Sequence, residues 1–115
     1  MHAEALIWAD EGAEALVQHL CFVDPAATTV MVGTGNFRAG QDLPDEGFSQ
    51  RPMREISIIL EGAIETEAAG KSVRLGAGDL VTIPPYEKHR SRFLEDTKLI
   101  YIYFGHRNIA CDADS

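Results

Sequence analysis

Two stretches decide the fold expected of this chain: Glu55-Ile-Ser-Ile-Ile-Leu-Glu-Gly62 and Gly78-Asp-Leu-Val-Thr-Ile-Pro-Pro-Tyr-Glu-Lys-His89. Each contains a short apolar run that ends in a turn signal, which is the pattern of a β-strand. Each also carries one side chain that can bind a metal or a proton, because Glu55 opens the first stretch and His89 closes the second. If the two strands pack together, both side chains reach the same cavity.

Further strands are expected on both sides of these stretches. Runs of β-branched and apolar residues predict strands at 28–37, 63–68, 72–75, 80–83 and 98–104. Residues 13–23 are read as a strand, although their helix formers leave a helix open, and residues 38–47 predict a loop. Gly33 and Gly35 predict a bulge or a bend. Frequent turn signals and no clear helix predict an all-β jelly roll or barrel.

The strand expected at 54–60 is apolar on both faces. Ile56, Ile58 and Leu60 alternate on one face, and Ile59 follows the small Ser57 on the other. Such a strand belongs between two sheets or beneath a partner subunit. Together with Leu6, Ile7 and Trp8, it predicts a homodimer that buries apolar surface.

Composition limits the class of protein. A chain of 115 residues predicts one domain, with a core at about 28–105 and a polar tail at 107–115. A net charge of -8 with ten Lys and Arg residues argues against a nucleic-acid partner. No apolar run reaches the length of a membrane span, and no signal peptide is evident, so we expect a cytoplasmic protein without a membrane partner. Cys21 and Cys111 are expected to be reduced thiols, with a disulfide between them as the alternative.

The two opening stretches resemble the conserved motifs of the cupin superfamily. The first cupin motif has His-x-His, then three or four residues, then Glu-x6-Gly, and the second has Gly-x5-Pro-x-Gly-x2-His-x3-Asn. Glu55 and Gly62 match the first motif, whereas Gly78, Pro84 and His89 match the second. The resemblance implies a cupin-type jelly roll, also called a double-stranded β-barrel, as a single domain.

This chain departs from both motifs. The two histidine positions of the first motif fall on Ser49 and Arg51 in one register, or on Phe48 and Gln50 in the other. In the second motif Tyr86 replaces the glycine, and Phe93 replaces the asparagine. None of these positions supplies a metal-binding histidine.

The departures bear on the metal that the resemblance implies. A cupin centre of three histidines and a glutamate suits Fe, Mn, Ni or Zn, but this chain keeps only Glu55 and His89. We therefore favour no metal cofactor. The alternative is a divalent transition metal held by Gln50, Glu55 and His89.

Arg51 suggests a different chemistry for the cavity. Its guanidinium is always charged and accepts no hydrogen bond, so at a ligand position it would oppose a dication. We expect Arg51 to set the charge of the cavity, to pair with Glu55, to keep His89 neutral and to bind a carboxylate-like anion. A surface arginine on the loop before the strand is the alternative.

Two classes of function follow from these residues. The favoured one is a small-molecule-binding cupin with a small anionic ligand, whose binding residues are Ser49, Arg51, Glu55, Tyr86 and His89. The alternative is a metal-dependent dioxygenase, isomerase or lyase of the kinds known among cupins. Glu55 and His89 are the candidate catalytic residues, and a metal-free enzyme with His89 as base beside Glu55 is a third reading. Whether the protein is an enzyme stays open.

Overall fold

The computed structural model describes residues 8–21 and 28–106, with only the backbone described at 16–21, 28 and 106. This part of the chain forms strands and no helix, so none of the described residues forms a helix that could cross a bilayer. The strands are β1 (Ala13–Cys21), β2 (Thr28–Phe37), β3 (Asp42–Leu43), β4 (Arg54–Glu61), β5 (Ala63–Ala68), β6 (Lys71–Gly76), β7 (Leu80–Ile83), β8 (His89–Phe93) and β9 (Thr97–His106).

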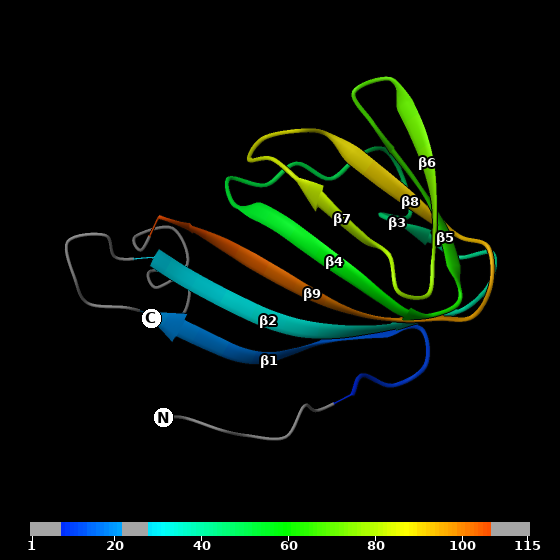
Figure 1. The fold of residues 1–115 in the computed structure, drawn as a ribbon, viewed down its shortest axis with the longest axis horizontal. Helices are drawn as coiled ribbons and strands as arrows, with labels where there is room; N and C mark the ends of the chain where they lie inside the picture. The colour runs from blue at the N-terminus through cyan, green and yellow to red at the C-terminus, as the bar shows by residue number, and fades with distance from the viewer. Residues whose placement is uncertain (1–7, 22–27, 107–115) are drawn as a thin grey trace.

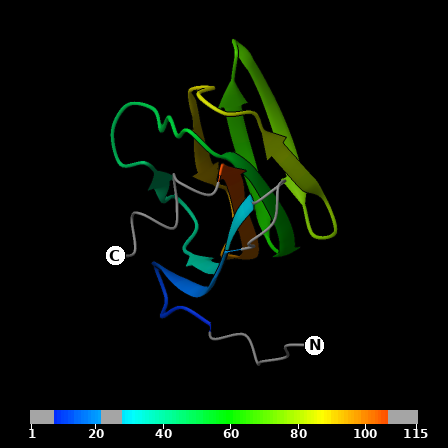
Figure 2. The ribbon, with the colours of Figure 1, turned by 90° about the vertical axis from the view of Figure 1, so that its left-hand side faces the viewer.

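The strands form two antiparallel sheets. The larger sheet has the order β1-β2-β9-β4-β7, and the smaller one has the order β3-β8-β5-β6. Figure 1 shows the sheets meeting at the right, where β4 leads into β5 and β8 leads into β9. Figure 2 shows them from one end as two layers. The chain therefore crosses repeatedly between the layers, and the core lies between them.

Alternation along the strands decides which side chains enter that core. The buried cluster takes the alternate residues Leu99, Tyr101 and Tyr103 from β9. Other strands add one residue each, among them Ile59 of β4, Ile64 of β5 and Phe93 of β8. The Phe37 and Phe93 rings stack with centroids 4.2 Å apart and so join the larger sheet to the smaller one. These apolar contacts hold the two sheets together at one end of the sandwich. Burial of apolar surface stabilises the fold by roughly 25 cal/mol per Å².

Glycines shape two of the turns that the sequence indicates. Gly62, between β4 and β5, has φ +96°, and an added Cβ would collide with Thr97. Ala69 and Gly70 both have positive φ, which is the geometry of a two-residue hairpin turn between β5 and β6. The turn signal that ends the first motif stretch at Gly62 is therefore confirmed.

The structure corrects the predicted strand list at β3 and β8. Residues 38–47 are not only a loop, because Asp42 and Leu43 pair with β8. β8 was not expected, since His89-Arg-Ser-Arg-Phe93 has no apolar run. Its arginines alternate with the buried His89 and Phe93, and β3 and β5 pair with it on either side. The polar segment 89–93 is therefore a strand because it pairs with a strand on each side.

Gly33 and Gly35 of β2 have a different role from the one predicted. The irregularity lies in β1, between Leu16 and Gln18, whereas β2 pairs regularly with β9. An added Cβ at Gly33 would overlap the Tyr101 ring, and one at Gly35 would overlap the Phe37 ring. Of the two predicted alternatives, a bulge or a bend, the bulge lies in the partner strand β1 and not in β2. The glycines make room for aromatic rings.

The outer face of the larger sheet is apolar. Strand register places Ile56, Ile102 and Val32 side by side on this face, where all three are half-buried. Leu60 is 42% exposed and Leu80 is 60% exposed. Within the single chain only the inner residues of 54–60, such as Ile59, are fully covered, so burial of the outer face stays a prediction that depends on a partner subunit.

Several sequence predictions fall outside the described residues. They are the apolar contribution of Leu6 and Ile7, the reduced state of Cys111 and the polar tail at 107–115. The Cys21 thiol is likewise undescribed.

Candidate functional site

A cavity of about 520 Å³ lies between the two sheets, within the range of about 300–1,000 Å³ typical of small-molecule sites. One end of its lining is apolar, with Phe37, Ile64 and Phe93. Its charged lining residues are Glu14, Asp42, Asp45, Arg51, Glu55 and His89, and hydroxyl groups come from Ser49, Ser57, Thr66, Ser91, Tyr101 and Tyr103. The cavity is therefore suited to a polar molecule.

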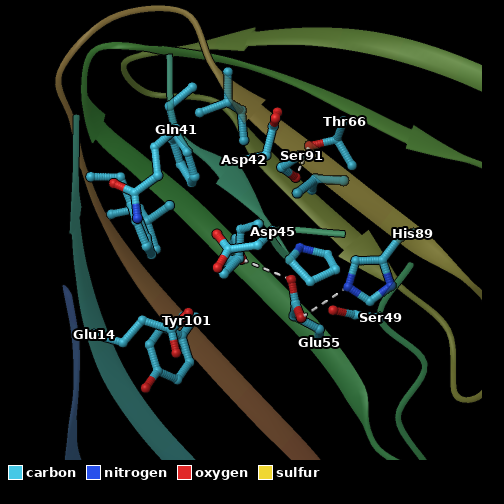
Figure 3. A pocket seen from close by; sticks show the side chains of 18 of the residues that line it. Glu14, Gln41, Asp42, Asp45, Ser49, Glu55, Thr66, His89, Ser91 and Tyr101 are labelled. Atoms are coloured by element: carbon cyan, nitrogen blue, oxygen red, sulfur yellow. Dashed lines mark hydrogen bonds and ion pairs between the residues drawn. The ribbon is translucent and has the colours of Figure 1, made fainter. Parts of the chain in front are cut away.

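These side chains reach the cavity because successive residues of a strand point to opposite faces of the sheet. β4 turns Glu55 and Ser57 inward, and the adjacent β9 turns Tyr103 and Tyr101 inward opposite them. β8 contributes His89 and Ser91 from the facing sheet (Figure 3). Both sheets therefore supply polar groups to one space, as expected for Glu55 and His89.

His89 and Glu55 make a direct contact across the cavity. The Nε2 atom of His89 lies 3.5 Å from Oε1 of Glu55, drawn as a dashed line in Figure 3. The other ring nitrogen, Nδ1, lies 3.0 Å from the backbone oxygen of Glu87. Both partners only accept hydrogen bonds, so both ring nitrogens are satisfied when each carries a proton. The geometry favours the imidazolium.

The pKa values of His89 and Glu55 shift in the directions that favour the charged form of each residue. The Glu55 contact is the main reason that the pKa of His89 is raised above 6.5, against an opposing effect of burial. Burial tends to raise the pKa of Glu55, but hydrogen bonds from His89, Ser57 and Tyr103 outweigh it and leave that pKa below 4.5. The expectation that Arg51 keeps His89 neutral is therefore wrong, because the charge of Arg51 lowers the His89 pKa by less than the Glu55 contact raises it.

Arg51 lines the cavity without an ion pair among the described residues. Its guanidinium carbon lies 5.0 Å from the centre of the Tyr103 ring. The expected pairing of Arg51 with Glu55 is wrong, since Glu55 binds His89 and Ser57 instead. Arg51 is exposed to solvent as well as to the cavity, as the surface-arginine alternative expected, so its donors are open to water or to a bound ligand.

Of the remaining predicted site residues, Ser49 lies on the cavity lining, whereas Tyr86 and Gln50 do not. Ser49 lines the cavity, and its backbone exchanges two hydrogen bonds with that of His89. Tyr86 does not line it and is 64% exposed. Gln50 is exposed too, and its side-chain amide donates to the Tyr86 backbone oxygen over 2.7 Å. The Tyr86 N–H donates to the Arg51 backbone oxygen, so Tyr86 and Gln50 hold the Arg51 loop.

The donor set does not fit a resident transition metal. Among the residues whose side chains the structure describes, no three His, Cys, Asp or Glu side chains are arranged to hold a metal ion. The side chain of Gln50 is engaged outside the cavity lining, so Glu55 and His89 are left as two candidate ligands. Catalytic zinc sites, for comparison, use three protein ligands.

Sequence reasoning missed the acidic lining. Glu14 and Asp45 face the cavity, and Asp42 forms a bidentate pair with Arg92 at 3.0 and 3.2 Å. Acidic lining residues therefore outnumber Arg51 and His89, against the expectation that Arg51 sets the charge. The available signal was Glu14, a lone charged residue in the strand predicted at 13–23.

Burial also affects the acidic groups of the lining. Partial desolvation by the cavity wall raises the pKa of the Glu14 carboxyl, with Arg51 opposing this shift and Glu55 adding to it, although Glu14 is an exposed residue. Burial likewise raises the pKa of Tyr103, so its hydroxyl stays protonated and can donate to Glu55. The alternation of Tyr101 with Tyr103 was visible in the sequence, but their place in the cavity was not.

Comparisons with known proteins agree with this architecture. Residues 41–105 match the profile of the cupin domain. The structure resembles that of KdgF from Halomonas sp., with a TM-score of 0.64 and 26% identity over 83% of this chain and 79% of that chain. It also resembles an RmlC-like cupin from Shewanella frigidimarina, with a TM-score of 0.59 and 19% identity over 78% of this chain and 86% of that chain. No curated protein matches the sequence. The expected all-β jelly-roll fold is confirmed.

Proposed function

Because this chain belongs to the cupin domain family, we propose that its cavity binds a small molecule bearing a carboxylate or a similar anionic group. Arg51 recognises the anion. The observation that carries the proposal is that this guanidinium lines the cavity and has no carboxylate partner among the described residues. A guanidinium offers a planar fork of donors that matches two carboxylate oxygens.

The surroundings of Arg51 support this role. The Tyr103 ring lies against the guanidinium, and the Tyr86 N–H fixes the Arg51 backbone, so both restrict the orientation of the fork. Such restriction reduces the entropy lost when a ligand binds. Tyr86 therefore serves the site through its backbone.

His89 and Glu55 act as a unit in the proposed site. The Glu55 carboxylate holds the imidazolium of His89 in place, and Ser57 and Tyr103 hold the carboxylate. A protonated His89 adds a second positive charge to the cavity. The hydroxyl of Ser49, also on the lining, offers the ligand a neutral hydrogen bond.

Binding of hexanoate, measured by isothermal titration calorimetry, tests the proposal. Arg51→Gln should weaken binding by about tenfold or more, because the only unpaired guanidinium of the lining is lost. Arg51→Lys should bind with intermediate strength, since it keeps the charge and loses the fork. Arg74→Gln is the matched control, because Arg74 is exposed on β6 and does not line the cavity. Equal binding by wild type and Arg51→Gln would rule out the assigned role.

The alternative, a metal-dependent enzyme built on Gln50, Glu55 and His89, has less support. It requires the Gln50 amide to leave its 2.7 Å contact with Tyr86 and enter the cavity. A metal-free reaction fits better, because the His89 and Glu55 pair could exchange a proton with a bound molecule. In that reaction the imidazolium would donate, so His89 would act as the acid.

A further inference from the structure

The carboxylates of the cavity fall into two groups. Asp42 is paired with Arg92, and Glu55 is paired with His89. Glu14 and Asp45 also line the cavity, but neither has an ion pair within the described part of the chain. The charged lining groups that have no ion-pair partner among the described residues are therefore the carboxylates of Glu14 and Asp45 and the guanidinium of Arg51.

These three groups share one space. Figure 3 shows Glu14 beside Tyr101 on one side of the cavity, Glu55 with His89 and Ser49 on the other, and Asp45 between them. The charge of Arg51 lowers the pKa of the Glu14 carboxyl and that of the His89 ring, so it reaches both sides of the cavity. An anion held by Arg51 would therefore lie near unpaired negative charge.

We infer that the ligand is amphoteric, with a carboxylate for Arg51 and an ammonium group for Glu14 and Asp45. The inference rests on the proposed function and specifies its ligand class. A ligand with only a carboxylate would place its negative charge near the carboxylates of Glu14 and Asp45, which repel it and which it cannot neutralise. An ammonium group has three donors and a compact charge, so it can satisfy two carboxylates at once.

This arrangement selects between related molecules. The two acidic side chains attract a ligand that carries an amine and repel one with a second anionic group. The hydroxyls of Ser49 and Tyr101 lie on the same lining and can accept from an ammonium group or donate to a carboxylate. Recognition therefore depends on both charges of the ligand.

Four probes of equal chain length test the inference by calorimetry with the purified full chain. Hexanoate carries only the anion, hexylamine only the cation, and 2-aminohexanoate and 6-aminohexanoate carry both at short and long spacing. We expect at least one of the two amino acids to bind about tenfold more tightly than hexanoate. The preferred isomer then reports the spacing between the two subsites.

Variants identify the residues responsible. Glu14→Gln should reduce the preference for the amino acid over hexanoate several-fold, and adding Asp45→Asn should remove it. Glu61→Gln is the control, because this exposed residue at the end of β4 does not line the cavity. Circular dichroism and thermal unfolding establish that each variant is folded.

The outcomes separate the two proposals. If hexanoate binds as tightly as both amino acids, or if the double variant keeps the full preference, the amphoteric ligand is excluded and anion binding at Arg51 stands. If none of the anionic probes binds, both proposals fail. Tight binding of hexylamine together with no binding of hexanoate would overturn the role of Arg51 and leave a cation site.

Discussion

His89 of β8 and Glu55 of β4 meet across the cavity, with 3.5 Å between Nε2 and Oε1, and so connect the smaller sheet to the larger one. Each shifts the pKa of the other in the direction that favours its charged form. This contact should be visible in a titration. Resonances of His89 followed by NMR should give a pKa above 6.5, and Glu55→Gln should lower it. Glu61→Gln should leave it unchanged, and a His89 pKa unaffected by Glu55→Gln would contradict the pairing.

Stability should depend on pH through the same contact. The raised pKa of His89 gives a stabilisation that is complete below 6.5 and is lost as the pH rises through the folded-state pKa. The lowered pKa of Glu55 gives one that is present above 4.5 and is lost as the pH falls through its folded-state value. The pair therefore stabilises most between these limits. In that window His89→Asn should lower the free energy of unfolding by about 1–3 kcal/mol, measured by urea denaturation, with a smaller loss at pH 9.

Metal content distinguishes the proposed site from the alternative. With two candidate ligands beside Arg51, protein purified without added metal should hold far less than one equivalent of Fe, Mn, Ni or Zn by elemental analysis. Arg51→His should raise metal affinity and weaken hexanoate binding, because it removes the opposing charge and adds an imidazole. Near-stoichiometric metal in the wild type that is lost in His89→Ala would support the alternative and direct attention to Gln50.

Gly33 is expected to be intolerant of a side chain. The added Cβ of Gly33→Ala would overlap the Tyr101 ring, which already fills the space beside β2. Displacing the ring should cost about 1–3 kcal/mol of unfolding free energy and should alter ligand binding, since Tyr101 lines the cavity. Gly76→Ala is the matched control, because its Cβ would meet nothing closer than 3.9 Å. Equal stability of the two variants would show that Tyr101 can move freely.

Tyr86 offers a test of strain. It has φ +66°, a left-handed conformation that suits the glycine found at this position of the cupin motif. Tyr86→Gly should raise the unfolding free energy by roughly 0.5–1 kcal/mol and leave hexanoate binding unchanged. Tyr86→Ala keeps the β-carbon and should not be stabilised. Weaker hexanoate binding in both variants would instead assign the Tyr86 side chain a direct role.

We propose that a second copy of the chain covers the outer face of the larger sheet. Ile56, Ile58 and Ile102 lie side by side there, and a contiguous apolar face of this kind is unusual on a monomer. Analytical ultracentrifugation should show a dimer in the wild type and a monomer in Ile102→Glu. Val73→Glu should remain dimeric, because Val73 is 51% exposed on the other sheet. A monomeric wild type would exclude this assembly.

The sequence by itself determined the fold class, most of the strands and four residues of the cavity lining, Ser49, Arg51, Glu55 and His89. Period-two alternation and β-branched residues predicted β2, β5 and β7 with the bounds that the structure shows. The two motif stretches predicted that Glu55 and His89 share a cavity, and both residues line it, one from each sheet. These features depend on local propensity and spacing, which a single sequence displays.

Only the tertiary structure decided the charges and contacts inside the cavity. β8 is polar and becomes a strand through its pairing with β3 and β5, and Glu14 reaches the cavity because β1 extends the larger sheet. Spacing along the chain did not reveal that Glu55 would bind His89 and leave Arg51 unpaired. The reason is physical: an electrostatic partner is chosen by distance and burial in three dimensions, and those distances exist only after strands far apart in the sequence have paired.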